Sequence, residues 1–408
     1  MIVALIALSC NPDLGSEPGV AWEYARALSD RVRVILICPP HQGSDVIIRE
    51  KIKDYNLNIF PVFIQFKKTD LLYRFPFNYF IYSEWHRSVR LALGELILTK
   101  KIDIIHQINT VGYRNYGGYH KLKKPVVWGP IDGLKNVNAS IARGSLGFRG
   151  GVYYLFYNLF NSLQLYNSVN LRKGIRNCFV IAATNDAQKV LTDVFKKKSL
   201  RIPEIGSFAY VHKTKRDYPD SEFKIVWSGL HIHRKCFPVF LRAISHLDQK
   251  IKEKLSIEII GNGPLHEKWK NMANGLSVKN INWHGWVKRE EALLIMNESH
   301  LVVVTSIREV TCTVVMEATS LGLPIFVPQL CGMGDWLGAN TKSVIPWVGE
   351  EAFIRLLANS IGNAVTDRIY YNELISESNA SAKRNSMNDH SEKIFGIYKK
   401  IIKIKGEY

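Results

Sequence analysis

The sequence predicts an α/β protein built from two doubly wound, Rossmann-like domains that face each other across a cleft. The chain has 408 residues, too many for a single hydrophobic core and suited to two domains of about 100–200 residues each. Short apolar runs rich in Val and Ile alternate with amphipathic stretches, the order that builds parallel sheets with crossover helices. A polar linker at residues 206–222, poor in aliphatic side chains, separates two such series.

Residues 1–205 form the first predicted domain. A strand at 2–8, a glycine loop at 15–19, a helix at 21–28 and a strand at 32–37 make a βαβ unit with a right-handed crossover. The loop lacks the GxGxxG spacing of a dinucleotide site, so it is either a tight turn or a loop whose amides approach a phosphate or a sugar. Further strands are expected at 103–109, 126–128 and 178–183.

This first domain offers two sets of candidate site residues. His106 lies near the carboxyl end of its strand, the edge at which ligands bind in open α/β sheets. An imidazole, with an ordinary pKa of ~6.5, can exchange a proton with a substrate hydroxyl, whereas the alternative is a hydrogen-bonded core histidine. The glycine loop supplies the second set, which is Gly15, Ser16, Glu17 and Gly19.

Residues 223–385 form the second predicted domain, and residues 386–408 a C-terminal helix with a basic tail. Apolar, β-branched runs predict its buried parallel strands. These strands are expected at 224–228, 256–260, 280–283, 301–305 and 324–327, with helices between them.

The stretch from Val302 to Pro328 combines a strand, a charged loop, a helix and a second strand. The helix N-terminus presents unpaired N–H groups and so favours a phosphate. Glu317, about one turn inside the helix, can accept hydrogen bonds from a ribose diol, and Glu309 before the helix can accept them from other hydroxyls. A sugar, a diphosphate and a nucleoside in a row fit this placement, whereas the alternative is two ordinary surface glutamates. Thr311, Cys312 and Thr313 offer side chains for the helix cap.

Glu309-x7-Glu317, followed by Gly322-Leu323-Pro324, resembles the sugar-nucleotide signature of the family 4 retaining glycosyltransferases, which have the GT-B fold. Five further pieces resemble segments of that family, two of them typical of a bacterial branch concerned with cell-surface polysaccharides. They are Gly15-Ser16-Glu17-Pro18-Gly19-Val20, Trp128-Gly129-Pro130, Ser228-Gly229 with Arg234-Lys235, Ile259-Ile260-Gly261-Asn262-Gly263-Pro264 and Trp283-His284-Gly285-Trp286-Val287.

The resemblance implies roles for individual residues. Lys235 and Arg234 would stabilise the departing diphosphate, Glu309 would bind the donor sugar and Glu317 the ribose. The family arginine that precedes this lysine aligns with Leu230, and the usual Gly-Phe-Gly aligns with Val310-Thr311-Cys312. Other residues implied at the donor are Thr311, Cys312, Thr313, Gly229, Gly261, Gly263, Trp286 and Val287, with the glycine loop on the acceptor or phosphate side.

The resemblance also implies retention at the anomeric carbon and a donor linked to UDP or GDP. No acidic cluster of the Asp-x-Asp type is present, and the six cysteines lack metal-ligand spacing, so we expect no metal and no cofactor. Cysteines without a disulfide pattern are typical of a reduced cytosolic protein.

The net charge of +18 points to an anionic partner. Aromatic and basic residues gather at 60–90 and at 143–173. This mixture suits the headgroup region of a membrane, although a buried flank of the core or, less well, single-stranded nucleic acid would also use it. We expect an anionic membrane surface and no nucleic acid.

The chain shows no signal peptide and no uninterrupted apolar run of about 18 residues, so a cytoplasmic protein on the inner face of the cell membrane is expected. The predicted function is transfer of a sugar to a growing, lipid-linked glycan in bacterial polysaccharide or lipopolysaccharide biosynthesis. The alternatives are a sugar-nucleotide epimerase of the same fold, a non-enzymatic sugar-binding protein and a nucleic-acid binder.

Overall fold

A computed structural model describes residues 1–40, 43–66, 78–138, 141, 146–207, 217–219, 221–275, 280–310 and 312–406. Its contacts divide the chain into two compact units. The N-terminal unit consists of Met1–Lys135, Leu163–Gly206 and Met387–Tyr408, and the C-terminal unit of Asn136–Ser162 and Ser207–Ser386. The chain thus enters the C-terminal unit at 136–162 before it returns, and its last helix belongs to the N-terminal unit. Among the helices in these ranges, none combines the length and the hydropathy that crossing a bilayer requires.

The N-terminal unit is built on a seven-stranded parallel sheet in the order β3-β2-β1-β4-β5-β6-β7. Successive side chains of β1 enter opposite cores, Val3 and Leu5 on one face and Ala4 and Ile6 on the other, so the strand is apolar throughout. The strands are β1 (Ile2–Ala7), β2 (Arg33–Cys38), β3 (Ile59–Phe63), β4 (Ile104–Asn109), β5 (Val126–Ile131), β6 (Phe179–Ala182) and β7 (Leu200–Arg201).

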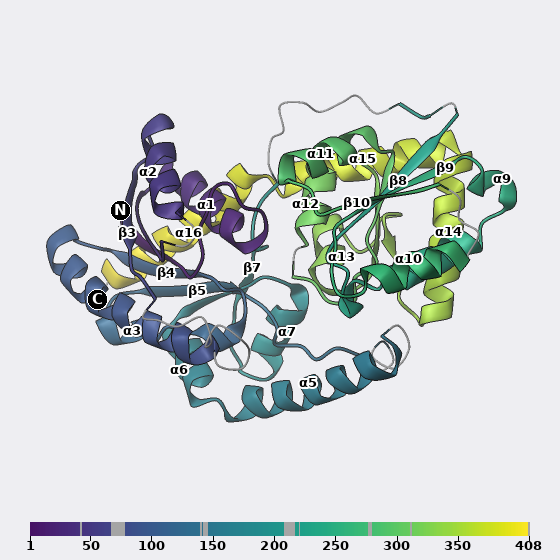
Figure 1. Cartoon of the computed structure of the whole chain (residues 1–408). Helices are drawn as coiled ribbons and strands as arrows, with labels where there is room; N and C mark the ends of the chain where they lie inside the picture. Colours follow the sequence, from purple (N-terminus) through teal and green to yellow (C-terminus); the bar gives the residue numbers. More distant parts are fainter. Residues whose placement is uncertain are drawn as a thin grey trace. The chain divides into compact units, whose positions relative to one another are not determined.

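Helices cover both faces of this sheet (Figure 1). Tyr398 of the last helix shares one core with Tyr24 and Ile48, while Trp85 and Leu191 fill the other. Figure 1 shows α16, from the C-terminal part of the chain, against α1. The helices are α1 (Ser16–Ser29), α2 (Ser44–Asp54), α3 (Asn78–Lys100), α6 (Val169–Asn177), α7 (Asn185–Asp193) and α16 (Met387–Gly406), with short 3-10 turns at Tyr113–Asn115 and Tyr119–Leu122.

The start of α1 corrects one prediction, because most of the expected glycine loop is the first turn of this helix. Gly15 is the N-cap residue and Ser16 begins the helix. Pro18 fits the first turn, where its missing N–H is not needed. A Cβ on Gly19 would lie 2.1 Å from the carbonyl oxygen of Leu14, so the close passage of these two backbone segments requires glycine there.

The C-terminal unit contains a six-stranded parallel sheet in the order β10-β9-β8-β11-β12-β13. The five strands predicted for this unit correspond to β8, β9, β10, β11 and β12. The strand that was not predicted, β13, has two residues, too few to form a pattern. The strands are β8 (Phe223–Ser228), β9 (Leu255–Ile260), β10 (Ile281–Gly285), β11 (Leu301–Val303), β12 (Ile325–Pro328) and β13 (Val344–Ile345).

One core of this unit joins the sheet to helices from distant parts of the sequence. Ile225 and Ile257 of the sheet pack with Phe240, Ile361 and, from the 136–162 segment, Tyr154. The helices assigned to this unit are α8 (Phe237–Ser245), α9 (Gln249–Lys252), α10 (His266–Gly275), α11 (Arg289–Glu298), α12 (Thr313–Ser320), α13 (Cys331–Leu337), α14 (Glu350–Thr366) and α15 (Arg368–Arg384), together with most of α5 (Gly147–Asn167) and a 3-10 turn at His233–Lys235.

The six strands of the second sheet repeat the order of the first six of the N-terminal sheet. In this doubly wound order the first strands are added on one side of the starting strand, and the later strands are added on its other side. The switch lies between β1 and β4 in one unit and between β8 and β11 in the other. Ligands of such sheets bind where the carboxyl ends of these two strands diverge. The prediction of two Rossmann-like domains is confirmed, and the topology selects the edge at which to look for a site.

Candidate functional site

The loops after β8, β9 and β10 meet at the carboxyl edge of the C-terminal sheet. The Gly229 N–H donates to the Ile260 carbonyl oxygen at 2.9 Å, and the Gly261 N–H to that of Gly285 at 2.7 Å. Gly261 has a φ of 119°, and a Cβ on it would lie 2.1 Å from the Gly229 oxygen. A Cβ on Gly263 would likewise lie 2.8 Å from the His231 oxygen. Gly261 and Gly263 therefore allow these loops to pack backbone against backbone, whereas the atoms nearest to a Cβ on Gly229 would be those of the Lys235 side chain, at 3.4 Å.

Three charged residues converge where β8 and β11 diverge. Oε1 of Glu309 accepts hydrogen bonds from Nη1 of Arg234 at 2.6 Å and from Nζ of Lys235 at 2.7 Å. Arg234 also donates to the Arg308 carbonyl oxygen at 3.0 Å, which fixes the loop that carries Glu309. The side chains of Lys235 and Glu309 are each 11% exposed. We call Arg234, Lys235 and Glu309 the charged cluster; its two cations and one carboxylate leave an excess positive charge suited to a phosphate.

Glu317, on the neighbouring helix α12, is paired with a residue that the sequence did not single out. Nε of Arg289, the first residue of α11, donates to Oε1 of Glu317 at 3.0 Å. Burial raises the pKa of Glu317, and the charge of Arg289 opposes this rise. Arg289 lies three residues after Trp286, so it joins Glu317 to the segment expected beside the nucleobase. Trp286 itself is exposed.

The start of α12 differs from the predicted hydroxyl-capped helix. The helix begins at Thr313, and among the described residues no side chain caps it. Helix N-termini carry a partial positive charge that favours anions. Cys312, the N-cap residue, has a φ of 62°, the left-handed conformation that glycine adopts most easily. The backbone keeps this conformation at a position where the resemblance implies glycine; Thr311 lies outside the described residues.

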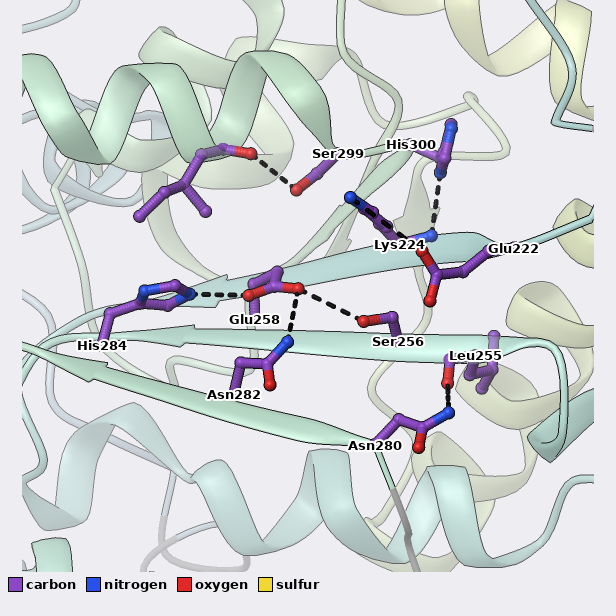
Figure 2. A network of polar contacts seen from close by, with 11 residues as sticks. Glu222, Lys224, Leu255, Ser256, Glu258, Asn280, Asn282, His284, Ser299 and His300 are labelled. Atoms are coloured by element: carbon purple, nitrogen blue, oxygen red, sulfur yellow. Dashed lines mark hydrogen bonds and ion pairs between the residues drawn. The ribbon is translucent and has the colours of Figure 1, made fainter.

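A polar network supports the edge strand that leads to Trp286. In Figure 2, Glu258 of β9 accepts hydrogen bonds from Asn282 at 3.0 Å and His284 at 2.6 Å, both on β10, and from Ser256 at 3.2 Å. Burial raises the pKa of Glu258, but these hydrogen bonds outweigh it and hold the pKa below its usual value. The network fastens the end of β10 to β9. The only sign of it in the sequence is a carboxylate in the middle of an apolar strand.

The N-terminal sheet carries the predicted glycine-loop residues at its own carboxyl edge. Oε1 of Glu17 accepts a hydrogen bond from the Val111 N–H at 3.4 Å, two residues after β4 ends. Burial raises the pKa of Glu17. Gly15 and Gly19 shape the helix start, and the side chain of Ser16 lies outside the described part of the structure.

His106 does not belong to a site. It is fully buried, its Nε2 lies 2.8 Å from the Gly129 carbonyl oxygen and its Nδ1 lies 2.5 Å from the Tyr398 hydroxyl. Because the carbonyl can only accept, Nε2 carries the proton and Nδ1 accepts from the tyrosine. Burial lowers the pKa of His106 to about 3. The predicted proton exchange with a substrate hydroxyl is therefore contradicted, and the core alternative is correct.

Residues 212–378 match the family model described as "Glycosyl transferases group 1". The matched segment contains the charged cluster, the Arg289–Glu317 pair and the three glycines. No curated protein sequence matches the chain significantly.

Solved structures with the same fold cover nearly the whole chain. Sucrose-phosphate synthase from Thermosynechococcus elongatus has a TM-score of 0.69 at 14% identity over 99% of both chains. HepE from Anabaena, in complex with UDP and glucose, has a TM-score of 0.61 at 13% identity over 98% of this chain and 100% of its own. WaaG, a glycosyltransferase involved in lipopolysaccharide biosynthesis, has a TM-score of 0.61 at 14% identity over 97% and 99%. At these identities the matches establish the fold, which is GT-B as predicted.

Proposed function

We propose that this protein is a glycosyltransferase that moves a sugar from a nucleotide donor to an acceptor hydroxyl. The charged cluster at the switch point of the C-terminal sheet carries the proposal, since a nucleoside diphosphate needs closely spaced cations in a partly buried place. Its position within the segment that matches the glycosyltransferase model supports the same reading. The structure of HepE with UDP and glucose provides a precedent for such a ligand in this fold.

In this proposal the charged cluster exchanges partners when the donor binds. Lys235 and Arg234, which share Oε1 of Glu309, turn to the diphosphate, and the positive end of the α12 dipole faces the same anion. Glu309 then accepts hydrogen bonds from donor-sugar hydroxyls. The cations stabilise the negative charge that grows on the phosphate oxygens as the sugar leaves.

We further propose that Glu317, oriented by Arg289, accepts hydrogen bonds from the ribose, beside Trp286 and Val287. Transfer would proceed with retention and without a metal, as the resemblance implies. The bond between the anomeric carbon and the phosphate oxygen breaks, and the acceptor oxygen bonds to that carbon on the same face. The acceptor proton passes to the leaving phosphate, which needs no protein base and agrees with the burial of His106.

The acceptor proposed is a lipid-linked glycan in bacterial polysaccharide or lipopolysaccharide biosynthesis, on the cytoplasmic face of the membrane. The net charge of +18 supports an anionic surface as a partner. The role of WaaG in lipopolysaccharide biosynthesis supports the class of product.

A transfer assay tests the proposal. The protein is incubated with radiolabelled UDP- and GDP-sugars and a lipid extract of bacterial membranes, and label is counted in the lipid fraction. Wild type should label the lipid, whereas Lys235→Ala should lose about 10²–10³-fold in rate because the leaving diphosphate loses a cation. The control is Lys224→Ala, which removes a lysine from the start of β8, whereas Lys235 lies in the 3-10 turn that follows the end of this strand.

Two outcomes would contradict the proposal. If Lys235→Ala labels lipid as fast as Lys224→Ala, the charged cluster does not bind the donor. If the donor is converted to a free epimer with no acceptor present, the protein is a sugar-nucleotide epimerase.

A further inference from the structure

Helix α5 (Gly147–Asn167) presents an apolar face to solvent. Six large side chains are more than half exposed at helical spacing, with Phe148 at 87% and the others between 55% and 62%. On one 21-residue helix, nine of the 25 exposed large hydrophobic side chains in the described residues are gathered. Monomeric proteins rarely expose so continuous an apolar face without a partner for it. We call the six residues the outer stripe: Phe148, Tyr153, Phe156, Leu159, Phe160 and Tyr166.

The opposite face of α5 is fastened to the C-terminal unit, which fixes the orientation of the outer stripe. Tyr154 is buried in the core of that unit. Asn158 exchanges two hydrogen bonds with the backbone of Val137, at 3.0 and 2.7 Å. The Arg308 guanidinium lies 4.2 Å from the centroid of the Tyr157 ring. Because the buried face is occupied, the outer stripe is available for a second partner.

The other aromatic and basic segment of the sequence lacks such a face where it is described. Its Trp85 is buried, and its indole N–H donates to the Ile64 carbonyl oxygen at 2.7 Å. The buried-flank alternative therefore holds for Trp85, while residues 67–77 lie outside the described residues. The exposed aromatic side chains point to α5 as the element with a partner outside the chain.

The charge around α5 identifies the kind of partner. No Asp or Glu occurs between Asp132 and Asp186, whereas this stretch contains six Lys and Arg residues. Arg149 on α5, and Arg172 and Lys173 on the following helix α6 (Val169–Asn177), are exposed. An aromatic, apolar stripe with cations at its margins and no carboxylates has the character of a helix that lies in the headgroup region of an anionic membrane. Docking of a second copy would instead bring like charges together.

We propose that α5 docks this protein onto an anionic lipid bilayer, parallel to its surface. The outer stripe enters the boundary between headgroups and acyl chains, and the exposed Arg149 of the same helix contacts the anionic headgroups. This docking surface is an addition to the proposed function. It rests on the proposed function in one respect, which is the location of the acceptor in the membrane. Tyr157, on the buried side of the same helix, contacts the residue next to Glu309, so the docking helix also borders the loop of the charged cluster.

Co-sedimentation with vesicles tests the docking in the absence of donor and acceptor. The vesicles contain phosphatidylcholine alone or about one-third phosphatidylglycerol, a composition that separates apolar from electrostatic binding. The double variant Phe156→Ser/Phe160→Ser removes the centre of the outer stripe. The matched control is Leu91→Ser/Leu98→Ser, which removes two exposed apolar side chains from helix α3.

Wild type and the α3 control should bind the anionic vesicles equally. The stripe variant should bind them about tenfold or more weakly, because two inserted rings are lost. Arg149→Gln should weaken binding to the anionic vesicles several-fold and leave the weak binding to pure phosphatidylcholine unchanged. Since all of these side chains are exposed, the unfolding temperatures should match that of wild type.

The proposal is overturned if the stripe variant binds anionic vesicles as wild type does. It is equally overturned if light scattering shows a dimeric wild type and a monomeric stripe variant, because a second copy then covers the stripe. Thermal shifts with UDP and GDP on the same samples report donor binding separately. A stripe variant that keeps them and still binds vesicles refutes the docking surface alone, whereas loss of nucleotide binding in wild type would refute the proposed function.

Discussion

The two sheets share a strand order but use the polar residues at their switch points differently. At the end of β4, Gln107 donates to the Asn115 carbonyl oxygen at 2.6 Å, and Asn109 accepts from the Leu8 N–H at 2.6 Å. These side chains and His106 are buried and bonded within the N-terminal unit. At the end of β8 and β11 the corresponding place holds the charged cluster. The polar side chains at the N-terminal edge are therefore bonded to one another and to the backbone, while the C-terminal edge retains charge for a ligand.

This difference teaches that topology supplies an edge but side-chain chemistry decides its use. Buried neutral hydrogen bonds are costly to break because each leaves an unsatisfied group. An ion pair at a partly exposed edge can exchange one anion for another, so a phosphate can replace Glu309 beside Lys235. We expect the N-terminal unit to respond to pH and to core substitutions, and the C-terminal unit to respond to ligands.

Acidification should give the largest contrast between the two units. Burial lowers the pKa of His86 and His106 to about 3 and that of His390 to about 4, all in the N-terminal unit, whereas in the described part of the C-terminal unit burial lowers the pKa of His231 to about 4. The stability that neutral histidines provide is complete above the unfolded pKa of 6.5 and is lost as the pH falls toward the folded pKa. At pH 5 each histidine should cost about 1–2 kcal/mol.

Hydrogen exchange at pH 7 and pH 5, corrected for the intrinsic rates, measures this contrast peptide by peptide. Protection should fall more in β1, β4 and α16 than in β8 and β9. An equal loss in both units would show that the buried histidines do not set the pH response.

Substitution of His106 by alanine should be the next largest effect. It removes both hydrogen bonds and opens a cavity between β4 and α16, at a cost of about 2–4 kcal/mol in the free energy of unfolding. Urea unfolding measures this cost, and the exposed His246→Ala should change it little. The turnover of the folded fraction should stay at the wild-type value. A large loss of turnover without a matching loss of stability would show that His106 takes part in catalysis.

Loss of Arg289 should have a smaller effect, confined to donor binding. Without its charge the buried Glu317 becomes protonated more readily and accepts poorly from a ribose hydroxyl. Arg289→Gln should raise KM for the donor about tenfold and change kcat less, which corresponds to a uniform binding contact. Arg242→Gln, which removes an arginine paired with Glu350 and Glu351 and not with Glu317, is the control.

A donor with a 2′-deoxyribose sharpens this test. It should bind wild type more weakly and be nearly insensitive to Arg289→Gln. If the substitution weakens the deoxy donor as much as the normal one, Arg289 acts on another part of the ligand.

Relief of strain at Cys312 should be the smallest effect. Its φ of 62° is costly for a side chain with a Cβ, so Cys312→Gly should stabilise the protein by about 0.5–1 kcal/mol, less whatever the buried thiol contributes. Cys312→Ser keeps the Cβ and should give no gain in urea unfolding. A clear loss of stability in the glycine variant would mean that packing of the thiol outweighs the strain.

The sequence predicted the fold well because apolar runs and glycine turns are local patterns. It missed β13 because two residues form no pattern, and it placed the start of α1 too late because a Gly and a Pro in a first helical turn look like a loop. His106 was misassigned because its partner, Tyr398, lies 292 residues away in the sequence. The local sequence pattern around a strand histidine is the same whether its side chain faces a crevice or a helix that is distant in the sequence.

The candidate site was predictable where a motif constrains it and not where it depends on packing. Arg234 and Lys235 contact Glu309, although Glu309 lies 75 residues after Arg234 in the chain. The contact of Arg289 with Glu317 depends on how α11 and α12 pack, and no spacing in the sequence encodes it. The structure was therefore needed to show which charged side chains pair with one another.

Titration calorimetry of UDP and GDP against wild type, Lys235→Met and the Lys224→Met control tests the central claim most directly. Wild type and the control should bind one of the two nucleotides with equal affinity, and Lys235→Met should bind it at least tenfold more weakly because the diphosphate loses a charge-assisted hydrogen bond. Equal binding by Lys235→Met, or no binding of either nucleotide to wild type, would contradict the claim that the charged cluster holds the diphosphate of a nucleotide sugar.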